Sequence, residues 1–249
     1  MASDRVELSQ EMLLAALGDS WPQAEVSAAA ELLSGGGGQF PSGTRSLPSD
    51  LVSAVQRERL LAAMLRATAE LGYREVSVQD VLDRAGVSRP TFYEHFENKE
   101  GCFLAAFDSA ASRLRKRLET AAEDGEGWRP RLRLSLEELL RFVTEDPAAA
   151  MSLIVDARAA CPPALERRDE LLDHFASCLD TQVRAEAAEA PSAIAAAGIV
   201  GGIEALLYAR LNRGEAGEVQ SLLPSLMYFA VLPYEGHEAA SEELAVAAG

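Results

Sequence analysis

The chain has 249 residues, of which 48% are hydrophobic and 25% are charged, and its formal net charge at pH 7 is −16. These are ordinary values for a globular protein, and they exclude a chain that is disordered throughout. The negative charge argues against a protein coated in nucleic acid or lying on an anionic membrane, although it leaves room for a local basic surface. Only 6% of the residues are aromatic, and the many Ala and Leu residues favour helices over strands.

The cysteines and the missing motifs narrow the class of protein further. The three cysteines, Cys102, Cys161 and Cys178, are odd in number and form no CxxC pair. We therefore expect neither a disulfide framework nor a four-cysteine zinc site, and we expect the protein to reside in a reducing compartment. The sequence contains no GxGxxG, Walker, GxSxG or HExxH motif. We therefore expect a soluble cytoplasmic protein that is not an enzyme, with no metal, no cofactor and no membrane partner.

The composition of the first 50 residues predicts an N-terminal extension that is loosely attached to the folded body. Residues 6–17 and 24–33 have the pattern of two short helices, and their role is left open. Residues 34–50 contain four consecutive glycines followed by Pro and Ser, which is the composition of a flexible linker.

Local signals predict three helices and the start of a fourth between residues 51 and 118. Apolar residues recur at helical spacing from Leu51 to Leu71. Ser77 and Asp80 resemble a capping box that opens a short second helix. Ser88 can cap a third helix after a glycine-containing turn, with Pro90 in its first turn. A fourth helix is expected to reach about Leu118.

Three such helices with a tight turn before the third are typical of a helix-turn-helix motif. The run from Ser77 to Glu100, SVQDVLDRAGVSRPTFYEHFENKE, resembles the DNA-binding domain of TetR-type transcriptional regulators, and the resemblance covers residues 57–118. It implies an all-α fold in which this domain, residues 51–118, precedes a helical effector-binding and dimerisation domain, residues 119–249. Helices in the second domain are expected at 131–144, 147–159, 163–187, 191–212 and 216–231.

The resemblance implies that the third helix enters the major groove of DNA. Phe92 and Phe96 lie four residues apart and are interpreted as core anchors. Arg89 is the expected base-reading residue, because its planar fork fits guanine, and a phosphate contact is the alternative. The other expected DNA contacts are Ser77, Ser88, Pro90, Thr91, Tyr93, His95 and Lys99. Ser88 is a cap first and a phosphate contact second, and Arg45 is a weaker candidate for the adjacent minor groove.

Charge is distributed unevenly along the chain. Residues 51–118 contain eleven basic and nine acidic residues, about +2, which leaves −18 for the rest of the chain. A mildly basic head on an acidic body is consistent with docking on DNA in one orientation.

The resemblance implies that the second domain contains an effector pocket and a dimer interface. The pocket candidates are aromatic and aliphatic residues, each of which is also compatible with plain core: Phe103, Phe107, Phe142, Met151, Ile154, Val155, Phe175 and Leu179. The run from Ala195 to Ile203 is rich in small residues that allow close helix approach, with core packing within the chain as the alternative. The expected interface residues are Ile199, Ile203, Leu206, Leu207, Leu222, Leu226 and Phe229.

These expectations combine into one functional hypothesis. The chain is interpreted as a ligand-responsive transcriptional regulator, a repressor by default, that binds a palindromic DNA operator as a homodimer. A small apolar or amphipathic effector releases it by favouring one of two conformations. The alternative is a helical interaction protein that retains the fold but has lost specific DNA binding.

Overall fold

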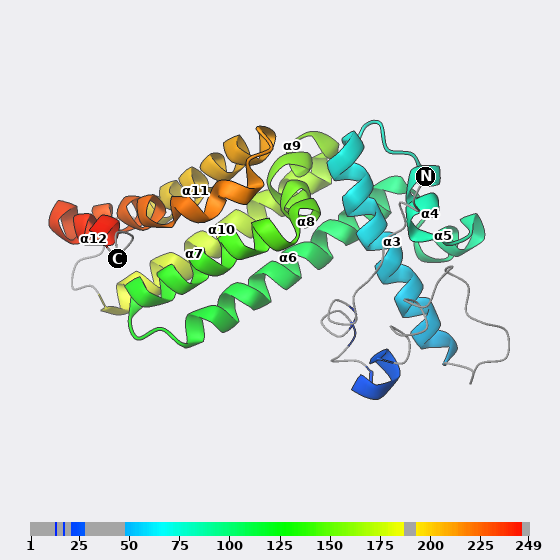
Figure 1. Ribbon diagram of the computed structural model, residues 1–249, viewed down its shortest axis with the longest axis horizontal. Helices are drawn as coiled ribbons and strands as arrows, with labels where there is room; N and C mark the ends of the chain where they lie inside the picture. The colour runs from blue at the N-terminus through cyan, green and yellow to red at the C-terminus, as the bar shows by residue number, and fades with distance from the viewer. Residues whose placement is uncertain (1–12, 14–16, 18–20, 28–47, 187–192, 246–249) are drawn as a thin grey trace. The chain divides into compact units, whose positions relative to one another are not determined.

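The computed structural model describes residues 13, 17, 21–27, 48–186 and 193–245. It divides into two compact units, residues 1–109 and 110–249, which are described separately below. Every regular element in these described ranges is helical (Figure 1). The boundary falls within helix α6 (Lys99–Glu123), earlier in that helix than residue 118, where the sequence analysis places it.

The N-terminal unit contains the three expected helices and the start of the fourth. They are α3 (Ser49–Leu71), α4 (Val78–Ala85) and α5 (Arg89–His95), followed by the start of α6. Helix α3 packs against both α4 and α5. Phe92 and Phe103 are fully buried, and Phe96 is 7% exposed, which confirms that Phe92 and Phe96 are core anchors.

The caps explain where α4 and α5 begin. Ser77 and Asp80 form the expected capping box, in which each residue's side chain accepts a hydrogen bond from the other's backbone N–H. Ser88 accepts a hydrogen bond from the backbone N–H of Thr91 and caps α5. Between the two helices Gly86 has φ +63°, a left-handed conformation in which Cβ would be strained. The tight turn therefore depends on a glycine at this position.

Only a small part of the N-terminal extension lies within the described residues. Residues 23–27 are helical, and Leu13, Leu17 and Val26 are buried. The rest of the two helices expected at 6–17 and 24–33, and nearly all of the linker, lie outside the described residues.

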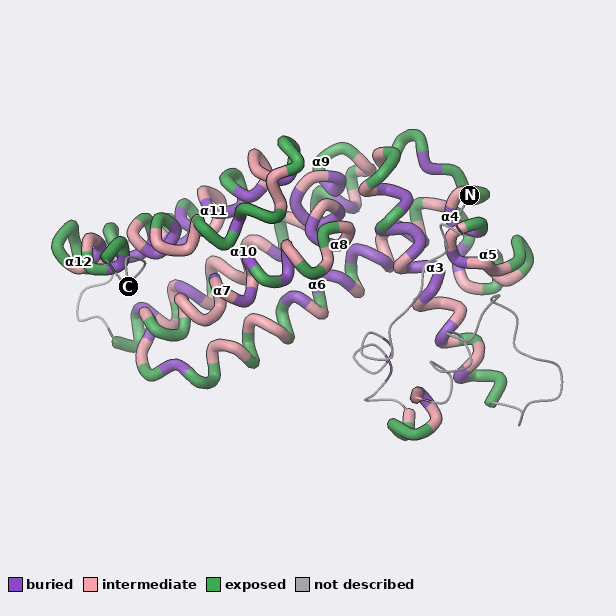
Figure 2. The backbone as a smooth tube through the Cα atoms, viewed as in Figure 1, coloured by how far each residue is buried: buried purple, intermediate pink, exposed green. Residues whose placement is uncertain are grey.

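The C-terminal unit is built from helices that continue after α6. They are α7 (Trp128–Glu145), α8 (Pro147–Met151), a π-helical turn (Ser152–Asp156), α9 (Ala157–Ala160), α10 (Pro162–Glu186), α11 (Ile194–Asn212), a 3-10 helix (Ala216–Leu222) and α12 (Leu223–Ala245). Helix α10 packs against α7 and α11, and α11 packs against α12. Buried residues recur along one side of these helices (Figure 2), as expected for amphipathic helices around a shared core.

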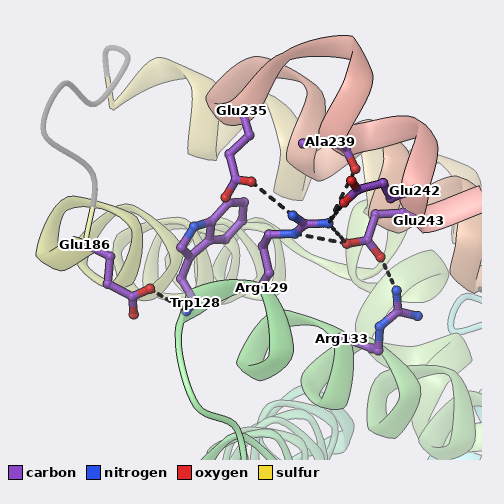
Figure 3. Close-up of polar contacts among 8 residues, drawn as sticks. All are labelled: Trp128, Arg129, Arg133, Glu186, Glu235, Ala239, Glu242 and Glu243. Carbon is purple, nitrogen blue, oxygen red and sulfur yellow. Dashed lines mark hydrogen bonds and ion pairs between the residues drawn. The ribbon is translucent and has the colours of Figure 1, made fainter.

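Helix α12 extends beyond the expected end at residue 231. It contains Pro233 and is broken at Gly236, where φ is +81°. Arg129 ties both sides of the break to α7: it donates hydrogen bonds to Glu235 before the break, at 3.1 Å, and to Glu243 after it, at 2.6 and 3.0 Å (Figure 3). Arg133 also donates to Glu243, whose side chain is 6% exposed. This ion cluster fixes the C-terminal segment on the start of α7.

Helix α11 is long and apolar enough, by length and composition alone, to cross a membrane. Its one acidic residue, Glu204, is buried and accepts hydrogen bonds from Arg158 and Arg168. One face of α11 packs on α10. Both features are typical of the core helix of a globular domain.

Candidate nucleic-acid interface and ligand cavity

Helix α5 presents several of the predicted contact residues to solvent. Arg89, Pro90 and Tyr93 are exposed and Thr91 is half-buried, because Phe92 turns to the opposite side and fills the core. The Tyr93 ring is 51% exposed and meets the Phe92 ring edge-on, with centroids 5.4 Å apart. The head thus offers a cation, a proline ring, a hydroxyl and a phenol on one short helix, which is a set suited to base edges and phosphates.

Arg89 is held by Gln79, a residue that no motif of the sequence singles out. Its Nη2 atom donates to Oε1 of Gln79 at 3.0 Å, and Nε2 of Gln79 donates to Oδ1 of Asp83 at 2.8 Å. Gln79 and Asp83 lie on α4, ten and six residues before Arg89. No helical periodicity connects positions on two helices across a turn, so the sequence carried no signal for this contact.

The donors of Ser77 are used within the chain. Its backbone N–H and hydroxyl both donate to Oδ2 of Asp80, at 2.8 and 2.5 Å. These hydrogen bonds hold the pKa of Asp80 below its ordinary value, so a carboxylate occupies the N-terminal end of α4. Ser77 thus caps α4, and its phosphate contact stays a prediction.

The side chains of His95 and Lys99 are partly buried in the N-terminal unit. Nε2 of His95 is buried without a hydrogen-bond partner in the described structure, and burial, followed by the charge of Arg57, lowers the pKa of His95. The ammonium of Lys99 donates to the carbonyl oxygens of Tyr73 at 2.9 Å and Val76 at 2.8 Å. One of the three N–H donors of Lys99 remains for DNA, and the DNA contacts of Lys99 and His95 stay predictions. Arg45 lies outside the described residues.

A mostly apolar cavity of about 180 Å³ lies within the C-terminal unit. Its lining comes from α6, α7, α10 and α11 and from the π-helical turn. Four of the eight predicted pocket residues line it: Phe142, Ile154, Phe175 and Leu179. The lining residues of α10 run from Arg168 to Gln182, a span of about 21 Å at 1.5 Å per residue. A mostly apolar wall of this extent suits an apolar ligand.

Four of the predicted pocket residues do not line this cavity. Phe103 and Phe107 are buried in the N-terminal unit, where the Phe103 ring packs on Tyr73 at a centroid distance of 4.8 Å. Met151 and Val155 are absent from the lining, whereas Ile154, which lies between them in the sequence, belongs to it. The π-helical turn at 152–156 changes the number of residues per turn, so α-helical spacing does not apply to this segment.

Polar groups are few in the cavity wall. Glu204 and Arg168 line it as an ion pair with a 2.8 Å separation. His174 lies near two other lining residues, 3.7 Å from Sγ of Cys178 and 3.9 Å from Oε1 of Glu119. No group of His, Cys, Asp and Glu in the described part of the chain could hold a metal ion.

The predicted interface residues fall into two groups. Ile199, Ile203, Leu207 and Leu226 are at most 6% exposed and belong to the core of their own unit. Leu206 and Phe229 are 47% and 40% exposed, and Leu222 is half-buried. Apolar residues occur around the whole circumference of α11, so the spacing of apolar residues could not show which side faces the chain's own core.

One side of α11 has open space next to its glycines. A Cβ atom added at Gly198 or Gly201 would meet nothing within 4 Å, whereas one at Gly202 would lie 2.9 Å from the Phe229 ring. Ile194, one turn before Gly198, is 76% exposed. An apolar strip with small residues therefore faces outward from α11.

The fold and the exposed α5 face define the class: an all-helical protein with a helix-turn-helix head and a helical unit that encloses an apolar cavity. Comparison with known proteins identifies the family. Residues 60–106 match the family model described as bacterial regulatory proteins, tetR family. Residues 60–106 of this chain therefore carry a helix-turn-helix domain similar to that of this family.

Two curated relatives match about half of the chain. The HTH-type transcriptional activator FasR of Mycolicibacterium smegmatis is 31% identical over 114 residues, which cover 44% of this chain and 50% of FasR. The HTH-type transcriptional repressor AcnR of Corynebacterium efficiens is 31% identical over 132 residues, which cover 51% of this chain and 62% of AcnR. The chain therefore spans about half the length of the curated relatives it matches, and both are transcription regulators, not enzymes.

Solved structures share the fold over nearly three quarters of this chain. The fatty acid degradation regulator FadR of Bacillus halodurans has a TM-score of 0.65 at 17% identity, covering 73% of this chain and 95% of that one. FadR of Bacillus subtilis in complex with stearoyl-CoA has a TM-score of 0.62 at 19% identity, covering 71% and 97%. At these identities the likeness shows the fold alone.

Proposed function

We propose that this protein is a ligand-responsive transcriptional regulator that binds a palindromic operator as a homodimer. The observation that carries the proposal is the exposed face of α5 in a helix-turn-helix head, where Arg89, Pro90 and Tyr93 are accessible. Each head would place α5 in a major groove, and two heads would read half-sites about 34–36 Å apart. Such a protein acts on chromosomal DNA, so its compartment is the cytoplasm.

Selection of binding sites from random duplexes tests this function. The protein should enrich a two-fold symmetric sequence and retain it in the presence of heparin, and Arg89→Ala should weaken that binding by about 1–3 kcal/mol with relaxed preference at one base pair per half-site. An equal loss on selected and random DNA would make Arg89 a phosphate contact. Failure to enrich any sequence would refute the function and favour the interaction-protein alternative.

The dimer in this proposal uses the outward strip of α11 together with the exposed part of α12. Its support is the combination of open space at Gly198 and Gly201 with exposed Leu206 and Phe229. Small residues allow close helix approach, and exposed apolar side chains mark association surfaces. Leu206→Glu should shift the sedimentation coefficient from dimer to monomer, and Glu218→Gln, on the exposed 3-10 helix, serves as a control. A variant that stays dimeric would move the interface elsewhere.

The effector in this proposal is an apolar or amphipathic small molecule held in the cavity. Support comes from the apolar lining and its span along α10, and from the complex of FadR of Bacillus subtilis with stearoyl-CoA. Stearoyl-CoA is therefore the first probe, added to the protein–operator complex. Leu139 lines the cavity and Leu134, on the same helix, does not. Leu139→Trp should abolish release by the probe, and Leu134→Trp should not.

Repression is the direction that we propose, and a reporter gene behind the selected operator tests it. Expression should rise when the protein is removed from the host. A fall in expression would instead make the protein an activator, the direction that the name of FasR carries.

A further inference from the structure

We infer that Gln79 is a positioning residue that sets the orientation of the Arg89 guanidinium for base reading. This inference rests on the proposed DNA-binding function and extends it from α5 to the preceding helix. Gln79 is exposed near the start of α4, and Arg89 is the first residue of α5. The hydrogen bond between them, 3.0 Å from Nη2 of Arg89 to Oε1 of Gln79, joins the two helices of the motif.

The chemistry of the three side chains fixes the direction of the contact. Arg89 only donates hydrogen bonds and an ionised Asp83 only accepts them. The Gln79 amide therefore must present its oxygen to Arg89 and its NH2 group to Asp83, which accepts it at 2.8 Å. A flipped amide would lose both hydrogen bonds. Asp83 thus orients Gln79, and Gln79 orients Arg89.

The contact leaves Arg89 competent to bind DNA. A guanidinium has five N–H donors, and Gln79 takes one of them. A bidentate contact to guanine O6 and N7 needs two more. Because the partner is a neutral amide, the guanidinium keeps its full attraction for DNA, whereas a directly bound carboxylate would compete with a phosphate or a base edge. A restrained arginine also loses less rotamer freedom on binding than a free one.

The expected effect is moderate, because the hydrogen bond is exposed. Loss of the amide should lower affinity for the selected operator by about three- to tenfold, the range of a single hydrogen bond. Binding to random DNA should stay within about twofold, since the substitution changes no charge and the salt slope counts charged phosphate contacts.

A double-mutant cycle tests the inference on the full-length protein. The variants are Gln79→Ala, Arg89→Ala and the two combined, with Gln79→Met to keep the side-chain length and Gln56→Ala on α3 as a matched control. Fluorescence anisotropy measures the Kd for the selected operator, for operators changed at each base pair of a half-site, and for random duplex. Thermal unfolding of every variant verifies that the heads are folded.

The expected result is coupling. Gln79→Ala and Gln79→Met lose part of the discrimination at the same base pair as Arg89→Ala, and the combined variant is no worse than Arg89→Ala alone. Additive losses, a loss at a different base pair, or no loss at all would overturn the inference. Additive losses or a loss at another base pair would show that Gln79 contacts DNA itself. If the wild-type protein selects no operator, the proposed function fails first, before any variant is compared.

Discussion

The buried carboxyl group of Asp156 gives a stability prediction that needs no knowledge of the ligand or the operator. Asp156 lies at the end of the π-helical turn and is 9% exposed, and its Oδ2 atom has no hydrogen-bond partner in the described structure. Burial raises the pKa of this carboxyl from 3.8 to about 7. Between these two values the folded protein holds a proton that the unfolded chain releases.

The sign and the size of the effect follow from proton linkage. Because the folded state binds more protons between about pH 4 and 7, the free energy of unfolding falls as the pH rises through that window. A shift from 3.8 to about 7, at 1.36 kcal/mol per pKa unit, sets a ceiling of about 4 kcal/mol. Relaxation around the charge and water entry reduce it, so we expect about 1–4 kcal/mol. Asp156→Asn should stabilise the protein by this amount at pH 7.5 and by little at pH 4.5.

Urea denaturation of both proteins from pH 4.5 to 8 measures this difference. Subtracting one curve from the other cancels the carboxylates and histidines that the two proteins share. Asp173→Asn, an exposed position on α10, should give a difference near zero at every pH. A variant that is destabilised at pH 7.5, or whose advantage does not grow with pH, would show that the Asp156 carboxylate has a stabilising partner at neutral pH.

Three further stability predictions concern the caps, the ion cluster and the turn. Ser77→Ala should lower the free energy of unfolding by about 1 kcal/mol in urea, because the capping box is lost. Glu243→Gln should cost about 1–3 kcal/mol and speed amide hydrogen exchange after the break in α12, since Arg129 loses its charged acceptor. Gly86→Ala should cost about 1 kcal/mol at its left-handed φ. Gly101→Ala, inside α6 with Asn98 Oδ1 3.7 Å from the new Cβ, should instead stabilise by a similar amount. Equal signs for the two glycine variants would contradict the conformational argument.

The helix-turn-helix head could be predicted from the sequence because its signals are local. Ser77 and Ser88 cap the helices that they were expected to cap, and Gly86 ends α4. Each of these signals depends on residues within three or four positions of one another. Phe92 and Phe96 share one side of a helix and could be assigned to the core on that ground alone.

The cavity and the outward face of α11 could not be predicted in the same way. Phe142 and Phe103 have the same chemistry, and only the division of the chain into two units separates the first, which lines the cavity, from the second, which does not. On α11, Ile203 and Leu206 are equally apolar, yet one is 6% and the other 47% exposed. Both choices depend on which helices pack together, and that information is spread over the whole chain.

The polar contacts in the head limit how the protein can bind DNA. The donors of Ser77 and two of those of Lys99 are used inside the unit, so a phosphate contact from either side chain has to compete with these internal hydrogen bonds. With a head charge of only about +2, the salt-dependent attraction that drives non-specific binding is small. In the homodimer that we propose, affinity for the operator depends on a few exposed residues of α5 and on their duplication. This explains why a fixed orientation of Arg89 would matter more here than in a strongly basic head.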